Sequence, residues 1–386
     1  MENTKDILAR LVAFPTVSHR SNMDIVTYLQ EYLKNHGVET HLVRDPEEDK
    51  ASLHCRIGPA VDGGIILSGH TDVVPAEGQP WDTDPFQLTE RDGKLYGRGS
   101  ADMKGFLACC LSAVPDMVAA NLKKPVYFAF SYDEETGCQA APALIEDFKN
   151  HYTERARYAI IGEPSEMRPI VGQKGISVFR TRVTGSQGHS SRIRQEVSAI
   201  HVAAKLIQWL EGKMDTLIRE GHTDDRFDPN HTSLHVGVIE GGIAPNVIAG
   251  ACTFEWDMRV IPEDAPRQIL DEFQAFCQEL TLSLQQRFAG AAIQTEVLHP
   301  FVPPLDTAAD SAVARLITRL SGYKELQTVA YAAEAGQFAE GGFEAVICGP
   351  GSIAQAHRAN EFISLDQLEK GDSFIRAVIR YLKNTA

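Results

Sequence analysis

The chain has 386 residues, 43% of them hydrophobic and 23% charged, and its formal net charge at pH 7 is −15. This length predicts more than one compact domain, and the acidic balance argues against nucleic acid or an anionic membrane as a partner. No apolar stretch reaches the ~18 residues of a membrane span, and no secretory signal is expected from the first residues. The seven cysteines show no paired spacing, so we expect free thiols and a cytoplasmic protein.

The first 175 residues alternate helices with short apolar strands. This pattern is typical of a doubly wound, mostly parallel sheet in an α/β protein. Gly37 sits where a helix C-terminal cap belongs, and Pro115 predicts a kink in the second helix. The expected helices are 24–36, 102–117 and 138–148, and the expected strands are 64–68, 125–131 and 158–161.

The pattern changes in residues 176–299, where long strands and helices follow the order β-α-β-β-α-β of a split ferredoxin-like unit. The expected strands are 177–183, 232–239, 251–260 and 293–298, and the expected helices are 198–210 and 266–280. Pro300, Pro303 and Pro304 mark the exit. We therefore expect an α+β domain inserted into a catalytic domain made of residues 1–175 and 300–386.

The last segment returns to the first pattern, with a helix at 309–320 and strands near Thr328 and Ala345. The final helix begins with Ser364-x-x-Gln367, the spacing of a capping box.

Acidic and histidine residues follow several of the apolar runs in the first domain. Because strand ends of an α/β sheet meet at one crevice, we expect these side chains to lie close together. Two imidazoles and three carboxylates there predict a site for two divalent metal ions. The five candidate ligands are His70, Asp102, Glu135, Glu163 and His357.

Each of these residues also has an ordinary interpretation when it is taken alone. His70 could be a core or surface imidazole, Asp102 a helix N-cap, and Asp133-Glu134-Glu135 a solvated acidic loop. In a metal site, Asp72 could bind the second ring nitrogen of His70. One of Glu134 and Glu135 could bind metal while the other accepts a proton from water, and the spacing leaves open which does which.

The motifs around these residues resemble those of the di-zinc aminoacylase and carboxypeptidase family, over nearly the whole chain. The similarity is strongest to the branch that deacetylates N2-acetyl-L-ornithine, through stretches such as Trp81–Phe86, Glu334–Phe338 and Asn360–Phe362. The motifs shared with the family at large are Ser68–Pro75, Tyr96–Gly105, Asp133–Thr136, Gly162–Ser165 and Gly349–His357.

This resemblance implies roles for the site residues. His70 and Glu163 would bind one metal ion, Glu135 and His357 the other, and Asp102 would bridge them. Asp72 would orient His70, Glu134 would be the general base, and the Asp102–Met103 peptide would be cis. Zinc suits such a mixed ligand set, and cobalt is possible.

The resemblance also implies that the inserted domain is a lid through which a homodimer forms. His189 would stabilise an oxyanion in the partner subunit's site, although a turn histidine is the alternative. Arg259 would bind the substrate's α-carboxylate, although an ion pair with Asp257 is the alternative. Asn246 would be a further polar contact to the substrate.

The activity implied is hydrolysis of N2-acetyl-L-ornithine to acetate and L-ornithine in arginine biosynthesis, with a small N-acyl amino acid as substrate. Ala333 stands where relatives usually carry threonine, so another N-acyl-amino-acid deacylase, a succinyl-diaminopimelate desuccinylase or a dipeptidase remains an alternative. A non-catalytic metal-binding or dimeric interaction protein on the same fold is the alternative outside the enzymes.

Overall fold

The computed structural model describes residues 3–385, and the chain divides into two compact units. The second unit is an insertion in the sequence of the first, as the order of elements predicted. The first comprises Met1–Gly172, Leu305–Thr328 and Ala333–Ala386, and the second comprises Gln173–Pro304 and Val329–Ala332.

A nine-stranded sheet forms the centre of the first unit. Its strands are β1 (Thr40–Arg44), β2 (Ala51–Ile57), β3 (Ile65–His70), β6 (Val126–Ser131), β7 (Tyr158–Pro164), β8 (Ile170–Gln173), β15 (Leu305–Asp306), β16 (Gln327–Val329) and β17 (Glu344–Gly349). The order is β1-β2-β6-β3-β7-β17-β8-β15, with β16 beside β8.

The four central strands of this sheet are parallel. β3 runs parallel to β6 and β7, and β17 runs parallel to β7. The pairs β1–β2, β2–β6 and β17–β8 are antiparallel. The mostly parallel sheet predicted from the sequence is confirmed at its centre. The chain goes from β3 to β6 on one side and then to β7 on the other side of β3, and such a reversal opens a crevice at the carboxyl ends of the strands.

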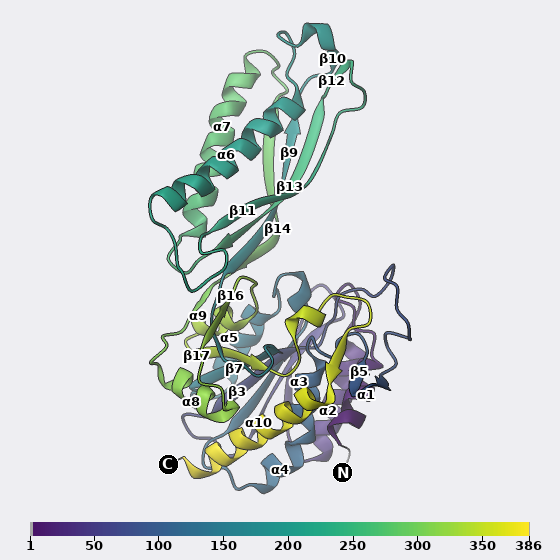
Figure 1. Cartoon of the computed structure of the whole chain (residues 1–386), viewed down its shortest axis with the longest axis vertical. Helices are drawn as coiled ribbons and strands as arrows, with labels where there is room; N and C mark the ends of the chain where they lie inside the picture. The colour runs from purple at the N-terminus through teal and green to yellow at the C-terminus, as the bar shows by residue number, and fades with distance from the viewer. Residues whose placement is uncertain (1–2, 386) are drawn as a thin grey trace. The chain divides into compact units, whose positions relative to one another are not determined.

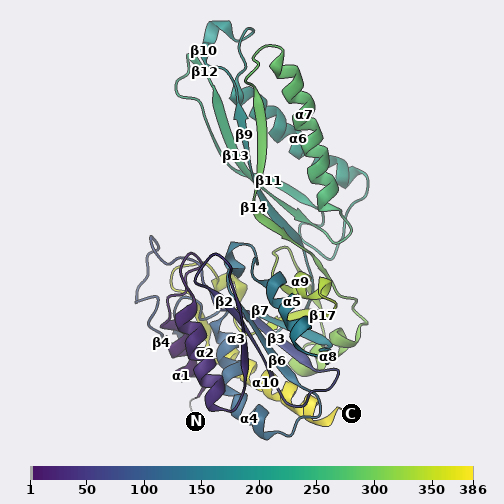
Figure 2. The ribbon, with the colours of Figure 1, turned by 180° about the vertical axis from the view of Figure 1, so that it is seen from behind.

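Helices cover both faces of this sheet (Figures 1 and 2). Alternate strand residues point to opposite faces: Phe128 packs in the core beneath α1, α2, α3, α8 and α10, whereas the ring of Tyr127 lies 5.0 Å from that of Phe148 in α5. The helices are α1 (Thr4–Val12), α2 (Met23–Asn35), α3 (Lys104–Ser112), α4 (Val114–Ala119), α5 (Ala141–His151), α8 (Ala312–Ser321), α9 (Ala335–Glu340) and α10 (Leu365–Asn384).

One predicted helix and two predicted capping features differ from the sequence predictions. The predicted helix 102–117 is two helices, because Pro115 lies in the first turn of α4 and a break at Ala113 separates it from α3. Asp102 does not cap α3, whose N-cap is Met103, so the N-cap interpretation was wrong. Ser364 does cap α10, but the side chain of Gln367 accepts from the amide of Gly351, so the capping box is only half formed.

The second unit has the predicted ferredoxin-like order. Its elements are β9 (Gly175–Thr184), α6 (Ala199–Arg219), β11 (Ser233–Gly241), β13 (Ala251–Val260), α7 (Pro266–Gln285) and β14 (Ala292–Val302). The antiparallel sheet has the order β11-β13-β9-β14, and Figure 1 shows α6 and α7 on one face of it. A separate core contains Trp256, whose ring stacks on that of Phe179 at a centroid distance of 4.4 Å and meets that of Phe273 edge-to-face at 5.0 Å.

The structure of residues 3–385 also bears on the expected free thiols and on membrane spans. All seven cysteines are buried and free. No helix in this range is long and apolar enough to cross a bilayer.

Candidate metal centre

The predicted ligands of the first unit converge at the carboxyl edge of the parallel strands. His70 is the last residue of β3, and Glu163 lies near the end of β7. Glu135 belongs to a short 3-10 turn, η1 (Glu134–Thr136), that follows β6. Asp102 immediately precedes Met103, the N-cap of α3, and its peptide bond with Met103 is cis, as the resemblance implied. His357 lies beyond β17 with a positive φ of 61°.

His70 lies at the centre of this cluster and is 1% exposed. Its Nδ1 is 2.9 Å from the backbone carbonyl of Asp72, which can only accept, so Nδ1 carries the hydrogen. Its Nε2 then faces the carboxylates, 3.1 Å from Asp102 Oδ1 and 3.8 Å from Glu163 Oε1. This orientation suits a metal-ligating imidazole, whose second nitrogen is bound by an acceptor.

Asp102 presents a different oxygen to each histidine. Oδ1 lies 3.1 Å from His70 Nε2, and Oδ2 lies 3.6 Å from His357 Nε2. His357 Nε2 is also 2.8 Å from Glu135 Oε2. An aspartate in this position has one oxygen for each of two neighbouring cations, which agrees with the bridging role implied for it.

The chemistry of the donor set fits divalent cations. Two overlapping groups, His70–Glu134–Glu163 and His70–Asp102–Glu135, each bring their ligand atoms within 4.8 Å of one another. Oε1 of Glu163 is buried and has no hydrogen-bond partner among residues 3–385. Burial, and then the neighbouring Asp102, raise the pKa of Glu163 well above its usual value. The carboxylates in this cluster outnumber the histidines, and bound cations would compensate their buried negative charge.

The three consecutive acids after β6 have three different surroundings. Asp133 binds Lys50 at 2.9 Å, and the Lys50 side chain is only 5% exposed. Glu135 pairs with His357, whereas Glu134 Oε1 accepts from the thiol of Cys138 at 3.4 Å. Burial, opposed by His70 and reinforced by Glu135, raises the pKa of Glu134 well above its usual value. The solvated-loop interpretation of these acids is therefore wrong.

Asp72 contacts more than the histidine it was expected to orient. Its carboxylate lies 3.5 Å from His70 Nδ1, and it accepts a hydrogen bond of 2.6 Å from Ser18. It also accepts from the backbone amides of Glu134 and Glu135 at 3.2 and 3.3 Å. Asp72 therefore connects the imidazole to the turn that carries both glutamates.

Gly349 ends β17 where it meets β7, next to the site. A Cβ atom at Gly349 would lie 1.9 Å from the carbonyl oxygen of Gly162. Because that contact is with backbone and cannot relax by a rotamer change, we expect Gly349→Ala to lower the free energy of unfolding by about 3 kcal/mol. Urea unfolding measures this.

The matched control is Gly78→Ala, since Gly78 has a φ of +78° and open space around its Cβ position. Only backbone strain of about 1 kcal/mol is expected there. Equal losses for the two variants would contradict the steric explanation.

His189 and Asn246 lie together in the second unit. The short strands β10 (Gly188–His189) and β12 (Val247–Ile248) pair, and the amide of Ser190 donates to the carbonyl of Asn246 at 3.0 Å. Both residues are exposed. Nδ1 of His189 accepts from the amide of Ser191, so in the neutral ring Nε2 carries the hydrogen and is free to donate.

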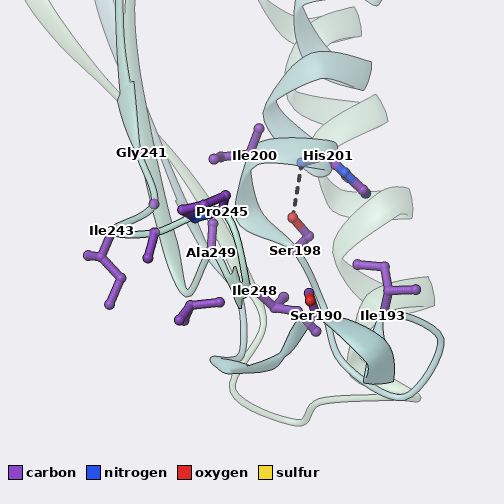
Figure 3. Close-up of a pocket in the computed structure, with 13 residues that line it drawn as sticks. Ser190, Ile193, Ser198, Ile200, His201, Gly241, Ile243, Pro245, Ile248 and Ala249 are labelled. Carbon is purple, nitrogen blue, oxygen red and sulfur yellow. Dashed lines mark hydrogen bonds between the residues drawn. The ribbon is translucent and has the colours of Figure 1, made fainter.

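A cavity of about 680 Å³ adjoins this pair of strands (Figure 3). Its lining is mostly apolar and includes Ile193, Ile200 and Ile243, whose side chains are exposed. His201 and Ser198 supply polar atoms on its helical side.

Arg259 lies on β13 and is partly exposed. Its Nη1 donates to the carbonyl of Ala330 at 3.3 Å, and its Nε lies 3.5 Å from Asp257. The ion pair considered as the alternative role is thus present, but it is long and uses only the Nε edge. The remaining guanidinium hydrogens can still form the two parallel bonds that a carboxylate accepts.

The sequence patterns gave no role to the buried ion pair of Arg98 and Glu361, or to the buried carboxylate of Glu334. Glu361 accepts hydrogen bonds from the turn that carries Asp102, and its buried partner is Arg98. Arg98 and Glu361 both lie in stretches that carried the family resemblance, Tyr96–Gly105 and Asn360–Phe362. Glu334 is 1% exposed, and burial raises its pKa to about 7.

The chain is similar in sequence to known proteins over most of its length. The model of peptidase family M20/M25/M40 matches residues 66–381. The chain is 35% identical to acetylornithine deacetylase of Myxococcus xanthus, over 97% of this chain and 96% of the relative.

Solved structures share the fold. An M20 family metallo-carboxypeptidase of Sulfolobus solfataricus superposes with a TM-score of 0.81 at 19% identity, over 99% of this chain and all of that one. A Bacillus subtilis protein described as a dinuclear metal-binding peptidase of the M20 family superposes with a TM-score of 0.64 at 14% identity, over 99% and 98% of the two chains.

Proposed function

This chain belongs to peptidase family M20/M25/M40 and is a metal-dependent hydrolase, and we propose that it removes the acetyl group from N2-acetyl-L-ornithine to give acetate and L-ornithine. The observation that carries the proposal is the convergence of His70, Asp102, Glu134, Glu135, Glu163 and His357 at one sheet edge. The similarity to acetylornithine deacetylase over nearly the whole chain supports the choice of substrate. A role in arginine biosynthesis and a cytoplasmic location are part of the same proposal.

His70 and Glu163 bind one divalent ion in this proposal, and Glu135 and His357 bind the other, with Asp102 shared between them. The unpartnered Glu163 oxygen and the two oxygens that Asp102 presents support this assignment. Zinc suits these ligands best, and cobalt is the alternative. When held by these residues, the divalent ions would supply Lewis-acid chemistry that polarises the acyl carbonyl and makes water a better nucleophile at neutral pH.

Glu134 is the proposed general base. Its raised pKa suits a group that accepts a proton from the attacking water and returns it to the leaving amine. Asp72 positions this carboxylate, because it binds the amides of Glu134 and Glu135 while its own carbonyl accepts from His70.

Three further roles are proposed for residues of the second unit. We assign binding of the substrate's α-carboxylate to Arg259, a polar substrate contact to Asn246, and stabilisation of the oxyanion to His189. The free Nε2–H of His189 supports its role as a donor. The proposed homodimer forms through this unit, in line with its exposed apolar side chains, Ile193, Ile200, Val238, Ile239 and Ile243.

A substrate panel tests the proposal. Protein reconstituted with Zn²⁺ or Co²⁺ is assayed with N2-acetyl-L-ornithine, N-succinyl-diaminopimelate, N-acetylmethionine and a dipeptide. We expect the highest kcat/KM for N2-acetyl-L-ornithine. Preference for another member of the panel would mean that the same catalytic residues serve a different deacylase, desuccinylase or dipeptidase activity. Two bound ions without turnover of any substrate would favour a metal-binding protein that is not an enzyme.

A further inference from the structure

Glu361 is a fully buried carboxylate that binds the turn carrying Asp102. Its Oε2 accepts from Arg98 Nη1 at 2.8 Å and from the amide of Gly99 at 3.0 Å. Its Oε1 accepts from the amides of Ala101 and Asp102 at 2.9 and 3.0 Å. All four hydrogen bonds are shielded from water, since both side chains of the ion pair are 1% exposed.

Arg98 extends this network to the segment that carries His357. Its Nη1 also donates to the carbonyl of Arg358 at 3.2 Å, and its Nη2 donates to the side-chain oxygen of Gln79. The amide nitrogen of Gln79 in turn donates to the carbonyl of His357 at 2.9 Å. The backbones of Asp102 and His357 are thus connected through three side chains.

His357 depends on such support more than the other candidate ligands do. Its side chain is 57% exposed, whereas those of His70, Asp102, Glu135 and Glu163 are at most 7% exposed. It lies outside helices and strands, in the left-handed backbone region that is uncommon for residues other than glycine. Packing therefore contributes little to its position, and backbone hydrogen bonds contribute much.

We propose that Arg98, Glu361 and Gln79 are positioning residues that fix the backbone of His357 relative to Asp102, and thereby set the affinity for the metal ion that His357 binds. The inference rests on the proposed metal ligands. Removal of one partner from a buried ion pair leaves an uncompensated charge and distorts its surroundings. Loss of the groups that orient a ligand typically weakens metal binding by about 10- to 100-fold.

The test titrates the metal-free protein with Co²⁺, following visible absorption, with equilibrium dialysis for stoichiometry. In Gln79→Ala we expect one of two sites to weaken about 10- to 100-fold while the other keeps its wild-type affinity. Glu361→Gln should act in the same direction and more strongly, because three backbone amides and Arg98 lose a charged acceptor.

Glu154→Gln is the matched control. Glu154 is a 5% exposed carboxylate bound to Arg56 and to the hydroxyl of Tyr127, near the start of β6 and thus at its opposite end from the site. We expect this variant to lower the melting temperature and leave both Co²⁺ affinities unchanged.

Wild-type affinity at both sites in Gln79→Ala and Glu361→Gln, or an equal loss at both sites, would overturn the inference. If Glu361→Gln does not fold, Gln79→Ala decides, because Gln79 is partly exposed and lies outside the buried ion pair. The readout does not involve substrate. If the wild-type protein binds two ions but does not hydrolyse N2-acetyl-L-ornithine, the proposed substrate is wrong, whereas the inference about the positioning residues is unaffected.

Discussion

Replacement of Glu134 with glutamine is expected to lower kcat by about 10²- to 10⁴-fold, the usual contribution of a general base, while two metal ions stay bound. Glutamine keeps the shape of the side chain but cannot accept the proton. The metal count matters because Glu134 lies in one of the two ligand-capable groups, with His70 and Glu163. Turnover and metal content are therefore measured on the same samples.

Asp133→Asn is the control for this variant, since Asp133 belongs to the same acidic run but binds Lys50 instead of the site. It should retain a rate near that of the wild type. If Glu134→Gln loses one ion together with its activity, Glu134 is a ligand, and the assignment of Glu134 and Glu135 must be exchanged. A Glu134→Gln variant with the wild-type rate would exclude the mechanism.

The sequence predicted those parts of the fold in which the pattern is local. Alternating strands and helices indicated the parallel sheet, and the β-α-β-β-α-β order indicated the inserted unit. The missed elements have weaker signals. β1 is an edge strand and β2 is its antiparallel neighbour, and both contain polar residues such as His41 and His54. The six-residue helix α9 is too short for a clear period.

The candidate ligands could be found because each follows or precedes an apolar run. Their mutual contacts could not, since the distance from His357 to Glu135 depends on loops far apart in the sequence. The spacing left open which of Glu134 and Glu135 binds metal. The two differ in the structure, because Glu135 contacts His357 whereas Glu134 accepts from the thiol of Cys138. The Arg98–Glu361 pair joins residues 263 positions apart, and no periodicity or spacing rule connects them.

Replacement of Arg259 with methionine is expected to lower kcat/KM for N2-acetyl-L-ornithine by about 30-fold or more, since loss of one partner of a hydrogen-bonded charge pair costs about 2–5 kcal/mol. Methionine keeps much of the length of the side chain and removes the guanidinium that the substrate's α-carboxylate would bind. The ion pair with Asp257 is long and partly exposed, so its loss should change stability little.

The α-carboxamide of N2-acetyl-ornithine separates recognition from folding, because it lacks the charge that Arg259 would bind. The wild-type enzyme should discriminate strongly between the acid and the carboxamide, and Arg259→Met should discriminate little. Arg180→Met is the matched control: Arg180 binds Glu255 and Glu296 in the same sheet, and its loss should leave the discrimination intact. If Arg259→Met lowers the rates for acid and carboxamide equally, Arg259 supports the structure of β13 and does not bind the carboxylate.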